Sequence, residues 1–384
     1  MPDIYHICQR PLTGVWSVMK TLAQYQQASL GMSVHLVILA DRGWPHRQEP
    51  GEIGLPCHFV ELPAFGGGVA LAYLELARVG RRISCLFPEP ALAHYHNAWM
   101  AGALLEGRGH AHAVVTFHGL PTDSHFTARP GRAAWHRHLA RRVLRSGAAL
   151  ASVDAEAVAR APQLLGIPAG RFTVVPNGVS DTHGRGCPRL QGAPVMTLGF
   201  LGALSDPKGW PLAAVAVARL AQSGQPVRLL IAGTGSPEAR DQAERLCAQT
   251  GNGSRYFGEI RNPRESFIPG IDALLLPTSG EGLPMSVLEC LSAAVPVIAT
   301  RVGGLPEILE DRVNGLFVQR DPVEIAGAVQ MLLEEPALHA TLSRNARRSF
   351  EIKGHVSQMA EGYRRIYRRV APALCGLEQA TAYL

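Results

Sequence analysis

Short runs of β-branched residues and leucine alternate with longer segments rich in Ala, Leu and Arg along most of this 384-residue chain. The runs predict strands at residues 34–39, 113–117, 172–175, 196–201, 227–231, 273–276 and 295–299. The segments between them predict helices at residues 71–79, 91–105, 132–145, 211–222, 237–249 and 285–293. Continuously apolar strands that alternate with helices are typical of parallel sheets covered on both faces. The predicted fold class is therefore α/β.

The pattern breaks around residues 180–194, where Asp-Thr-His-Gly-Arg-Gly-Cys-Pro precedes a new strand. We interpret this break as a linker, since 384 residues are too many for one ordinary core and suit two domains. The N-terminal domain is predicted to cover residues 1–187 and the C-terminal domain residues 188–354. The amphipathic stretch at residues 355–370 is expected to pack back on the first domain, and residues 371–384 form a tail.

Composition excludes some classes of protein. Hydrophobic residues make up 47% of the chain, which excludes a disordered protein. The formal net charge is +6, and arginine supplies nearly all of the 37 basic residues, because Lys20, Lys208 and Lys353 are the only lysines. Moderate basicity permits an anionic partner such as a nucleotide or a membrane surface without selecting one.

Targeting and thiol patterns favour a cytoplasmic protein. The first residues lack a charged segment followed by an apolar one, and no apolar run reaches the roughly 20 residues that cross a bilayer. The seven cysteines are scattered and never in C-x-x-C spacing, which favours reduced thiols over disulfides or a zinc site.

The strongest candidate site is a glycine-containing turn that reads Ser-Gly-Glu-Gly-Leu-Pro-Met-Ser-Val-Leu-Glu over residues 279–289. Pro284 suits the first turn of a helix, and the free N–H groups of a helix start favour an anion. Glu281 and Glu289 carry carboxylates, which accept hydrogen bonds from sugar hydroxyls. The pattern thus fits a nucleotide sugar, although an ordinary capped helix start explains the same residues equally well.

Two further turns follow predicted strands of the second half. Lys208 lies in Gly-Ala-Leu-Ser-Asp-Pro-Lys-Gly, at the carboxyl end of a strand, where a lysine can pair with a ligand phosphate. Gly233 and Gly235 permit close approach of a nucleobase or ribose, but Ser236 as an N-cap before Pro237 is a sufficient explanation for that turn. Dinucleotide-binding and P-loop glycine patterns are both missing.

The first half offers polar residues at predicted strand ends. His118 follows Val-Val-Thr-Phe, and either a backbone-satisfied histidine or a site residue fits that place. His94, His96 and Asn97 end another possible strand, where His96 and Asn97 could line the same cleft. Gly14 lies in the first strand–helix turn and would let a ligand approach closely.

In this order the motifs resemble the retaining glycosyltransferases of family 4, which have the GT-B fold of two Rossmann-like domains facing each other across a cleft. The matching pieces are Val-Thr-Phe-His-Gly at 115–119, Val-Pro-Asn-Gly-Val at 175–179, the Lys208-Gly turn, Ala-Gly-Thr-Gly at 232–235, Phe-Gly at 257–258, Glu281-x7-Glu289, Pro-Val-Ile-Ala at 296–299 and Val-Gly-Gly-Leu-Pro-Glu at 302–307. The ordered set is specific, although no single piece is decisive.

The resemblance implies a role for each matching residue. Lys208 would contact the donor diphosphate, Glu289 the ribose, and His118 the transferred sugar from across the cleft, with His118, Lys208 and Glu281 as the catalytic set. The donor sugar would be held by Glu281 and the backbone of Gly282, Leu283, Pro284 and Met285. The remaining donor contacts would be Gly14, Gly233 and Gly235, with His96 and Asn97 on the acceptor side.

The implied reaction is retaining and needs no metal or other cofactor. It moves a sugar from a UDP- or GDP-linked donor to a glycan or lipid-linked acceptor, in the assembly of surface polysaccharide such as lipopolysaccharide or exopolysaccharide. Ala203 stands where the family usually has arginine, and only Gly14 stands where it often has two glycines. These two departures keep a catalytically inactive GT-B scaffold open as an alternative. A nucleotide-sugar epimerase also stays open, because such enzymes share two facing α/β domains.

Two basic segments bear on partners. Residues 132–145 combine arginines with Trp135, Leu139 and Val143, which fits a helix lying on the inner face of the membrane as well as a surface helix that turns those three side chains to the core. Residues 362–369 are rich in Arg and Tyr, but without a recognisable binding motif we expect no nucleic-acid partner.

Overall fold

A computed structural model of the chain describes residues 3–9, 14–41, 54–62, 78–83, 85–86, 91–105, 112–120, 132–181 and 195–372. The chain divides into two compact units, of which the first comprises Met1–Gly178 and Val356–Leu384 and the second Val179–His355. The division lies ahead of residue 187, where the sequence places the boundary. Residues 182–194 of the expected linker lie outside the described residues.

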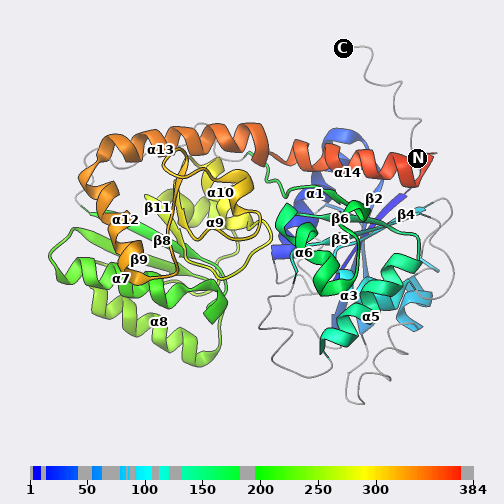
Figure 1. The fold of residues 1–384 in the computed structure, drawn as a ribbon, viewed down its shortest axis with the longest axis horizontal. Helices are drawn as coiled ribbons and strands as arrows, with labels where there is room; N and C mark the ends of the chain where they lie inside the picture. The colour runs from blue at the N-terminus through cyan, green and yellow to red at the C-terminus, as the bar shows by residue number, and fades with distance from the viewer. Residues whose placement is uncertain are drawn as a thin grey trace, which may run out of the picture. The chain divides into compact units, whose positions relative to one another are not determined.

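The first unit contains a parallel sheet with the strand order β3-β2-β1-β4-β5-β6-β7 (Figure 1). Its strands are β1 (Asp3–Gln9), β2 (Val34–Asp41), β3 (Cys57–Leu62), β4 (Ala91–Tyr95), β5 (Ala113–Phe117), β6 (Ala149–Ser152) and β7 (Phe172–Val174). This order is typical of doubly wound α/β folds, in which the carboxyl ends of the strands meet at one edge.

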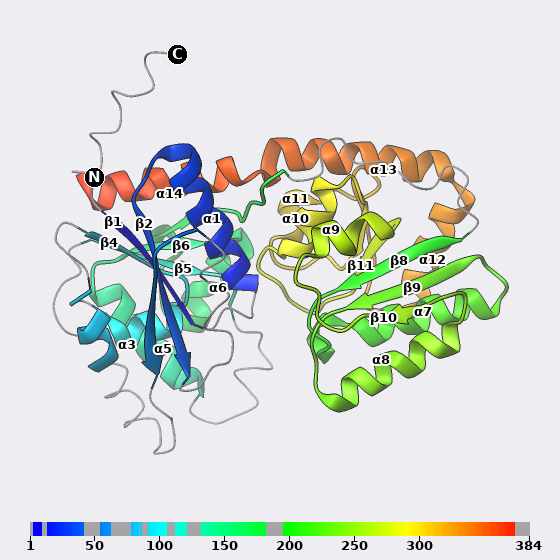
Figure 2. The ribbon, with the colours of Figure 1, turned by 180° about the vertical axis from the view of Figure 1, so that it is seen from behind.

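Helices cover both faces of this sheet. They are α1 (Gly14–Leu30), α3 (Ala98–Leu104), α5 (Arg132–Arg145), α6 (Ala155–Leu165) and α14 (Val356–Val370). Helices α1 and α14 pack against each other on one face, and α14 also contacts β5. Helices α3 and α5 lie on the other face, as Figures 1 and 2 show. The face under α3 and α5 is an apolar core that includes Tyr5, Tyr95 and Phe117.

The second unit repeats this plan with the strand order β10-β9-β8-β11-β12-β13. Its strands are β8 (Met196–Leu201), β9 (Val227–Ala232), β10 (Arg255–Tyr256), β11 (Ala273–Leu276), β12 (Val297–Ala299) and β13 (Gly315–Phe317). Its helices are α7 (Trp210–Gln222), α8 (Pro237–Thr250), α9 (Pro263–Ser266), α10 (Met285–Ser292), α11 (Leu305–Ile308), α12 (Pro322–Glu334) and α13 (Pro336–Ser349). Helices α7, α8 and α12 share one apolar core with the sheet, and α9, α10 and α13 lie on the opposite face (Figure 2). The two sheets are those of the GT-B fold.

Most predicted elements are confirmed, and one is wrong. The strands predicted at 113–117, 196–201 and 273–276 and the helix at 132–145 have the observed bounds. The predicted helix at 91–105 is instead the strand β4 followed by the short helix α3. Its Ala and Leu content suits a helix, but its first residues pair with β1 in the middle of the sheet. Residues 71–77 of another predicted helix lie outside the described residues.

The basic helix α5 turns its apolar residues inward. Leu139 and Val143 are buried, which confirms the core interpretation for these two side chains. Trp135 is half-buried, and its ring stacks on His138 with 5.7 Å between centroids. Within the described ranges, no helix combines the length and apolar character that crossing a membrane requires. The cysteines of the described part, Cys8, Cys57, Cys85, Cys247 and Cys290, are all free.

Candidate functional site

Loops after four strands of the second unit meet at the carboxyl edge of its sheet and are joined by backbone hydrogen bonds. The Leu204 N–H donates to the Thr234 carbonyl (2.7 Å), the Ser279 N–H to the Pro207 carbonyl (2.7 Å) and the Gly304 N–H to the Gly282 carbonyl (2.7 Å). Each bond links loops that follow different strands. The motifs that the sequence places at separate strand ends therefore form one rigid edge.

Lys208 and Glu281 form an ion pair across this edge. Lys208 ends a one-turn 3₁₀-helix, Asp206–Lys208, and its Nζ donates to Glu281 Oε1 at 2.5 Å. The Lys208 side chain is 30% exposed and that of Glu281 only 8%. An ammonium group has three protons, so the pair leaves Lys208 able to donate to a phosphate oxygen as well.

The Glu281 loop is held by an unusually close backbone approach. Gly303 has a φ of +57°, and a Cβ built on it would lie 1.9 Å from the Glu281 carbonyl oxygen. Only glycine fits such a contact. Pro284 precedes α10 without any side-chain cap, so the first N–H groups of α10 follow directly after the Glu281 loop. Leu283 and Met285 are buried, and they fix the start of the helix in the core.

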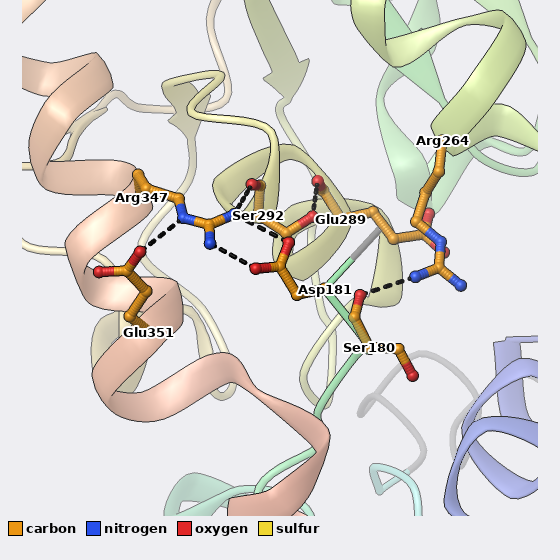
Figure 3. A network of polar contacts seen from close by, with 7 residues as sticks. All are labelled: Ser180, Asp181, Arg264, Glu289, Ser292, Arg347 and Glu351. Carbon is orange, nitrogen blue, oxygen red and sulfur yellow. Dashed lines mark hydrogen bonds and ion pairs between the residues drawn. The ribbon is translucent and has the colours of Figure 1, made fainter. Parts of the chain in front are cut away.

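Glu289 lies on α10 and is nearly buried, with 12% of its side chain exposed. Burial raises the pKa of Glu289 to about 7, and the guanidinium of Arg264 on α9, 3.8 Å away, opposes that rise. Arg264 also donates to the Ser180 carbonyl at 2.9 Å (Figure 3). A half-neutralised carboxyl can accept or donate hydrogen bonds near neutral pH, which suits contact with sugar hydroxyls.

Figure 3 shows how the same region is anchored to the start of the unit. Arg347 on α13 binds Asp181 with two hydrogen bonds of 3.0 and 2.5 Å and also donates to the Ser292 carbonyl of α10 at 2.7 Å. Its Nε donates to Glu351 at 2.8 Å. These carboxylates, Asp181 first, raise the pKa of Arg347. Arg347 thus ties α10 and α13 to the segment where the chain enters the unit.

The glycines at 233 and 235 have a structural explanation. Gly233 has a φ of +145°, and a Cβ there would meet the Gly202 carbonyl oxygen at 1.8 Å. A Cβ on Gly235 would meet Leu204 Cβ at 2.6 Å. Ser236 accepts a hydrogen bond from the Ala239 N–H, which confirms the predicted N-cap of α8. Close packing of two loops thus accounts for these glycines without a ligand.

Two arginines at this edge were not singled out by the sequence. Arg264 pairs with Glu289 as described. Arg320, after β13, donates to the Pro277 carbonyl at 3.2 Å and to the Asp206 carbonyl beside Lys208. Ala203 is exposed, and Arg320 is a second cation bonded to the Lys208 turn. Nothing local in the sequence marks Arg320, because its partners lie on loops far away along the chain.

In the first unit the structure brings together two of the predicted residues. His118 follows β5 and His96 follows β4, and His118 Nε2 lies 3.1 Å from His96 Nδ1. Burial lowers the pKa of His118 to about 4, so its ring is neutral. Asn97 donates to Gln9 Oε1 at 3.4 Å. Gly14 is the exposed first residue of α1, with no described atom near its Cβ position.

A histidine cluster in this unit was missed. Ring nitrogens of His6, His94 and His96 lie within 4.8 Å of one another among the described residues. The sequence argument against a zinc site rested on cysteine spacing alone. The available signal was the pair His94-x-His96 near the end of one possible strand, because alternate residues of a strand share a face. His6 lies within β1, which is not among the predicted strand ranges.

Comparisons with known proteins agree with the order of the motifs. The family model "Glycosyltransferase Family 4" matches residues 12–183, and "Glycosyl transferases group 1" matches residues 196–335. A 2-deoxystreptamine glucosyltransferase of Streptomyces kanamyceticus is 34% identical over 151 residues, which are 38% of each chain. The matched part spans less than half the length of the first curated relatives.

Solved structures show the same fold along nearly the whole chain. Anabaena HepE, determined with UDP and glucose, has a TM-score of 0.76 at 16% identity, covering 98% of this chain and 100% of HepE. WaaG, a glycosyltransferase involved in lipopolysaccharide biosynthesis, has a TM-score of 0.71 at 16% identity, covering 96% and 99%. With both family models matched in sequence order and this fold, the chain belongs to the family 4, or group 1, glycosyltransferases.

Proposed function

We propose that this protein is a retaining, metal-independent glycosyltransferase that moves a sugar from a nucleotide diphosphate-sugar to a glycan or lipid-linked acceptor. The observation that carries the proposal is the Lys208–Glu281 ion pair at the edge where the loops of the second unit are joined. It holds a cation and a carboxylate beside the uncapped start of α10. A diphosphate and the sugar attached to it need those two kinds of group side by side.

The chemistry assigned to this edge is electrostatic. As the bond to the transferred sugar breaks, negative charge grows on the leaving diphosphate. The ammonium of Lys208 and the first N–H groups of α10 stabilise that charge without having to reorganise. Glu281 and Glu289 accept hydrogen bonds from the donor sugar and the ribose, and His118 remains the proposed contact of the transferred sugar from the first unit.

Likeness to solved structures and the exposure of α5 guide the finer assignments. UDP is the first nucleotide to test, because HepE was solved with UDP and glucose. Surface polysaccharide is the proposed setting, which the likeness to WaaG supports. Peripheral contact with anionic lipid from the cytoplasmic side is proposed for the exposed residues Arg141 and Arg145 of α5, since Leu139 and Val143 are committed to the core.

Donor binding and turnover test the proposal. Calorimetry with UDP and with GDP should show heat for at least one, and the matching UDP- or GDP-sugars should be slowly hydrolysed without an acceptor, with retention at the anomeric carbon. Conversion of a donor into its epimer would replace the proposal with an epimerase. The absence of both binding heat and hydrolysis with every donor would instead support a catalytically inactive scaffold. Ala203, which stands where the family usually has arginine, is the reason for testing this outcome.

A further inference from the structure

A layer of buried polar side chains lies between the sheet of the first unit and the helices α1 and α14. His6 on β1 is in register with His94 on β4, and His96 follows two residues later on the same face. Their exposed fractions are 0%, 0% and 1%. We call these three residues and His118 the histidine layer. Such burial of polar rings is stable only when their nitrogens are hydrogen bonded.

Burial keeps the rings of the histidine layer neutral. It lowers the pKa of His6 and of His118 to about 4, and it lowers the pKa of His94 and His96 well below the usual value. A neutral imidazole has one N–H donor and one acceptor nitrogen. In a row of neutral rings, the first bond therefore decides the direction of all the others.

Gln26 on α1 sets that direction, because its amide oxygen can only accept. Gln26 Oε1 lies 2.7 Å from His6 Nε2, so His6 Nε2 carries the proton and His6 Nδ1 is an acceptor. His96 Nε2, 2.9 Å from His6 Nδ1, must then donate, which leaves His96 Nδ1 as an acceptor. His118 Nε2 donates to it over 3.1 Å. His118 Nδ1 is left with a lone pair.

The second branch from Gln26 agrees with the first. Gln26 Nε2 donates to the Tyr367 hydroxyl at 3.4 Å. The Tyr367 hydroxyl lies 2.7 Å from His94 Nδ1, and Thr116 Oγ1 lies 2.8 Å from His94 Nε2, so a hydroxyl is bonded to each nitrogen of His94. Both branches run through neutral rings without a conflict between two donors or two acceptors. One amide group thus assigns the proton positions of His6, His96 and His118.

The first branch ends at an atom without a partner. His118 Nδ1 is enclosed and makes no hydrogen bond among the described residues. We propose that Gln26, His6 and His96 are positioning residues that hold His118 in the Nε2-protonated tautomer, so that Nδ1 accepts a hydrogen bond from a substrate hydroxyl. The tautomer follows from the geometry alone, and the substrate hydroxyl rests on the proposed function.

A metal ion in the histidine layer is the competing explanation. Every ring nitrogen of His6, His94 and His96 already has a hydrogen-bond partner, and a bound ion would have to replace some of these bonds. The rings of His94 and His96 also lie over one another, with centroids 4.0 Å apart, rather than converging edge-on. Zinc would require nitrogens about 2.0–2.1 Å from one point.

The test is the side-chain ¹⁵N spectrum of the histidines in the full protein without substrate. Protonated and unprotonated ring nitrogens have well-separated resonances, so each tautomer is read directly. We expect wild-type His118 to have a protonated Nε2 and an unprotonated Nδ1. A wild-type His118 protonated on Nδ1, or a stoichiometric metal whose removal changes these resonances, would overturn the proposal.

Two variants separate the branches. Gln26→Leu removes the acceptor for His6 and should leave His118 as a mixture of tautomers, whereas Tyr367→Phe should disturb only His94. If Gln26→Leu does not fold, the His118 tautomer in the spectra of the wild type and of Tyr367→Phe still tests the proposal. An unchanged His118 in folded Gln26→Leu contradicts the proposal. The exposed Gln27→Leu on the same helix is the matched control.

Activity then links the tautomer to the reaction. In Gln26→Leu we expect kcat for sugar transfer to fall about tenfold, as for other losses of a partner that orients a site residue, with Gln27→Leu within about twofold of wild type. If Gln26→Leu has a mixture of His118 tautomers but an unchanged kcat, the proposed hydrogen bond from a substrate hydroxyl to His118 Nδ1 is wrong. Absence of transfer in wild type with the expected tautomer would instead reject the proposed function and leave the tautomer assignment intact.

Discussion

The two units place their polar side chains in opposite ways. The histidine layer of the first unit is neutral, with His6, His94 and His96 buried. Hydrogen bonds join His6, His96 and His118 in a row. The second unit has charged pairs at its sheet edge, Lys208 with Glu281 and Arg264 with Glu289, in which exposure ranges from 8% to 30%. Neutral polar groups can be buried when every donor and acceptor is satisfied, whereas a buried charge costs far more. The first unit therefore offers a ligand a hydrogen bond of defined direction, and the second unit offers it the electric field of charged side chains.

The largest expected effect concerns that field. Lys208→Ala should lower sugar transfer by at least about 10²-fold, because it removes the charge that stabilises the leaving diphosphate. Turnover and thermal melting are measured together, so that a folding defect is recognised. Lys20→Ala on α1 is the matched control. Near-normal turnover of a folded Lys208→Ala would mean that the charged edge has no catalytic role.

The next prediction uses the carboxyl group of Glu289. Its pKa of about 7 lies above that of an exposed glutamate, so the folded state retains a proton that the unfolded state loses between about pH 4.5 and pH 7. Wild type should therefore lose stability relative to Glu289→Gln as the pH rises through that window, by about 3 kcal/mol in total.

Urea unfolding at pH 5 and pH 8 measures this difference, with the exposed Glu265→Gln as the control. A constant gap between wild type and Glu289→Gln at both pH values would show that Glu289 is ionised at both. Burial would then leave this carboxyl charged in the second unit, whereas it keeps the histidines of the first unit neutral.

The smallest expected effect is on anchoring. Arg347→Ala removes two hydrogen bonds to Asp181 and one to the Ser292 carbonyl, and we expect a loss of about 2 kcal/mol. Arg348→Ala, an exposed neighbour on α13, should change stability by less than about 0.5 kcal/mol. Equal melting of the two variants would show that the partly exposed network in Figure 3 contributes little.

The sequence predicts what depends on local pattern. Continuous apolar runs located β5, β8 and β11 with their observed bounds, and the parallel order then brought the loops at Lys208 and Glu281 to one edge. The N-cap at Ser236 was also predictable, since its hydrogen bond spans three residues. For these features the physical cause lies within a few positions of the chain.

What the sequence did not predict depends on partners far apart in the chain. For β4 the sequence predicted both a helix at 91–105 and a possible strand ending near His94, because its alanines and leucine fit either, and pairing with β1 decides between them. The Lys208–Glu281 pair joins residues 73 positions apart, and the bond between His94 and Tyr367 joins residues 273 apart. The residue types indicated which residues belong to the site, but only the fold shows which side chains form ion pairs and hydrogen bonds with each other.

The contact between Gln26 and Tyr367 also orders events during synthesis of the protein. The two residues are 341 positions apart, and the ribosome releases the amino-terminal part first. Until α14 emerges, the nascent first unit lacks the tyrosine whose hydroxyl is hydrogen bonded to His94, and the face of the sheet that α14 covers stays open. The second unit uses one continuous stretch, Val179–His355. The unit that begins first is therefore the one that finishes last, because α14 is made after the whole of the second unit.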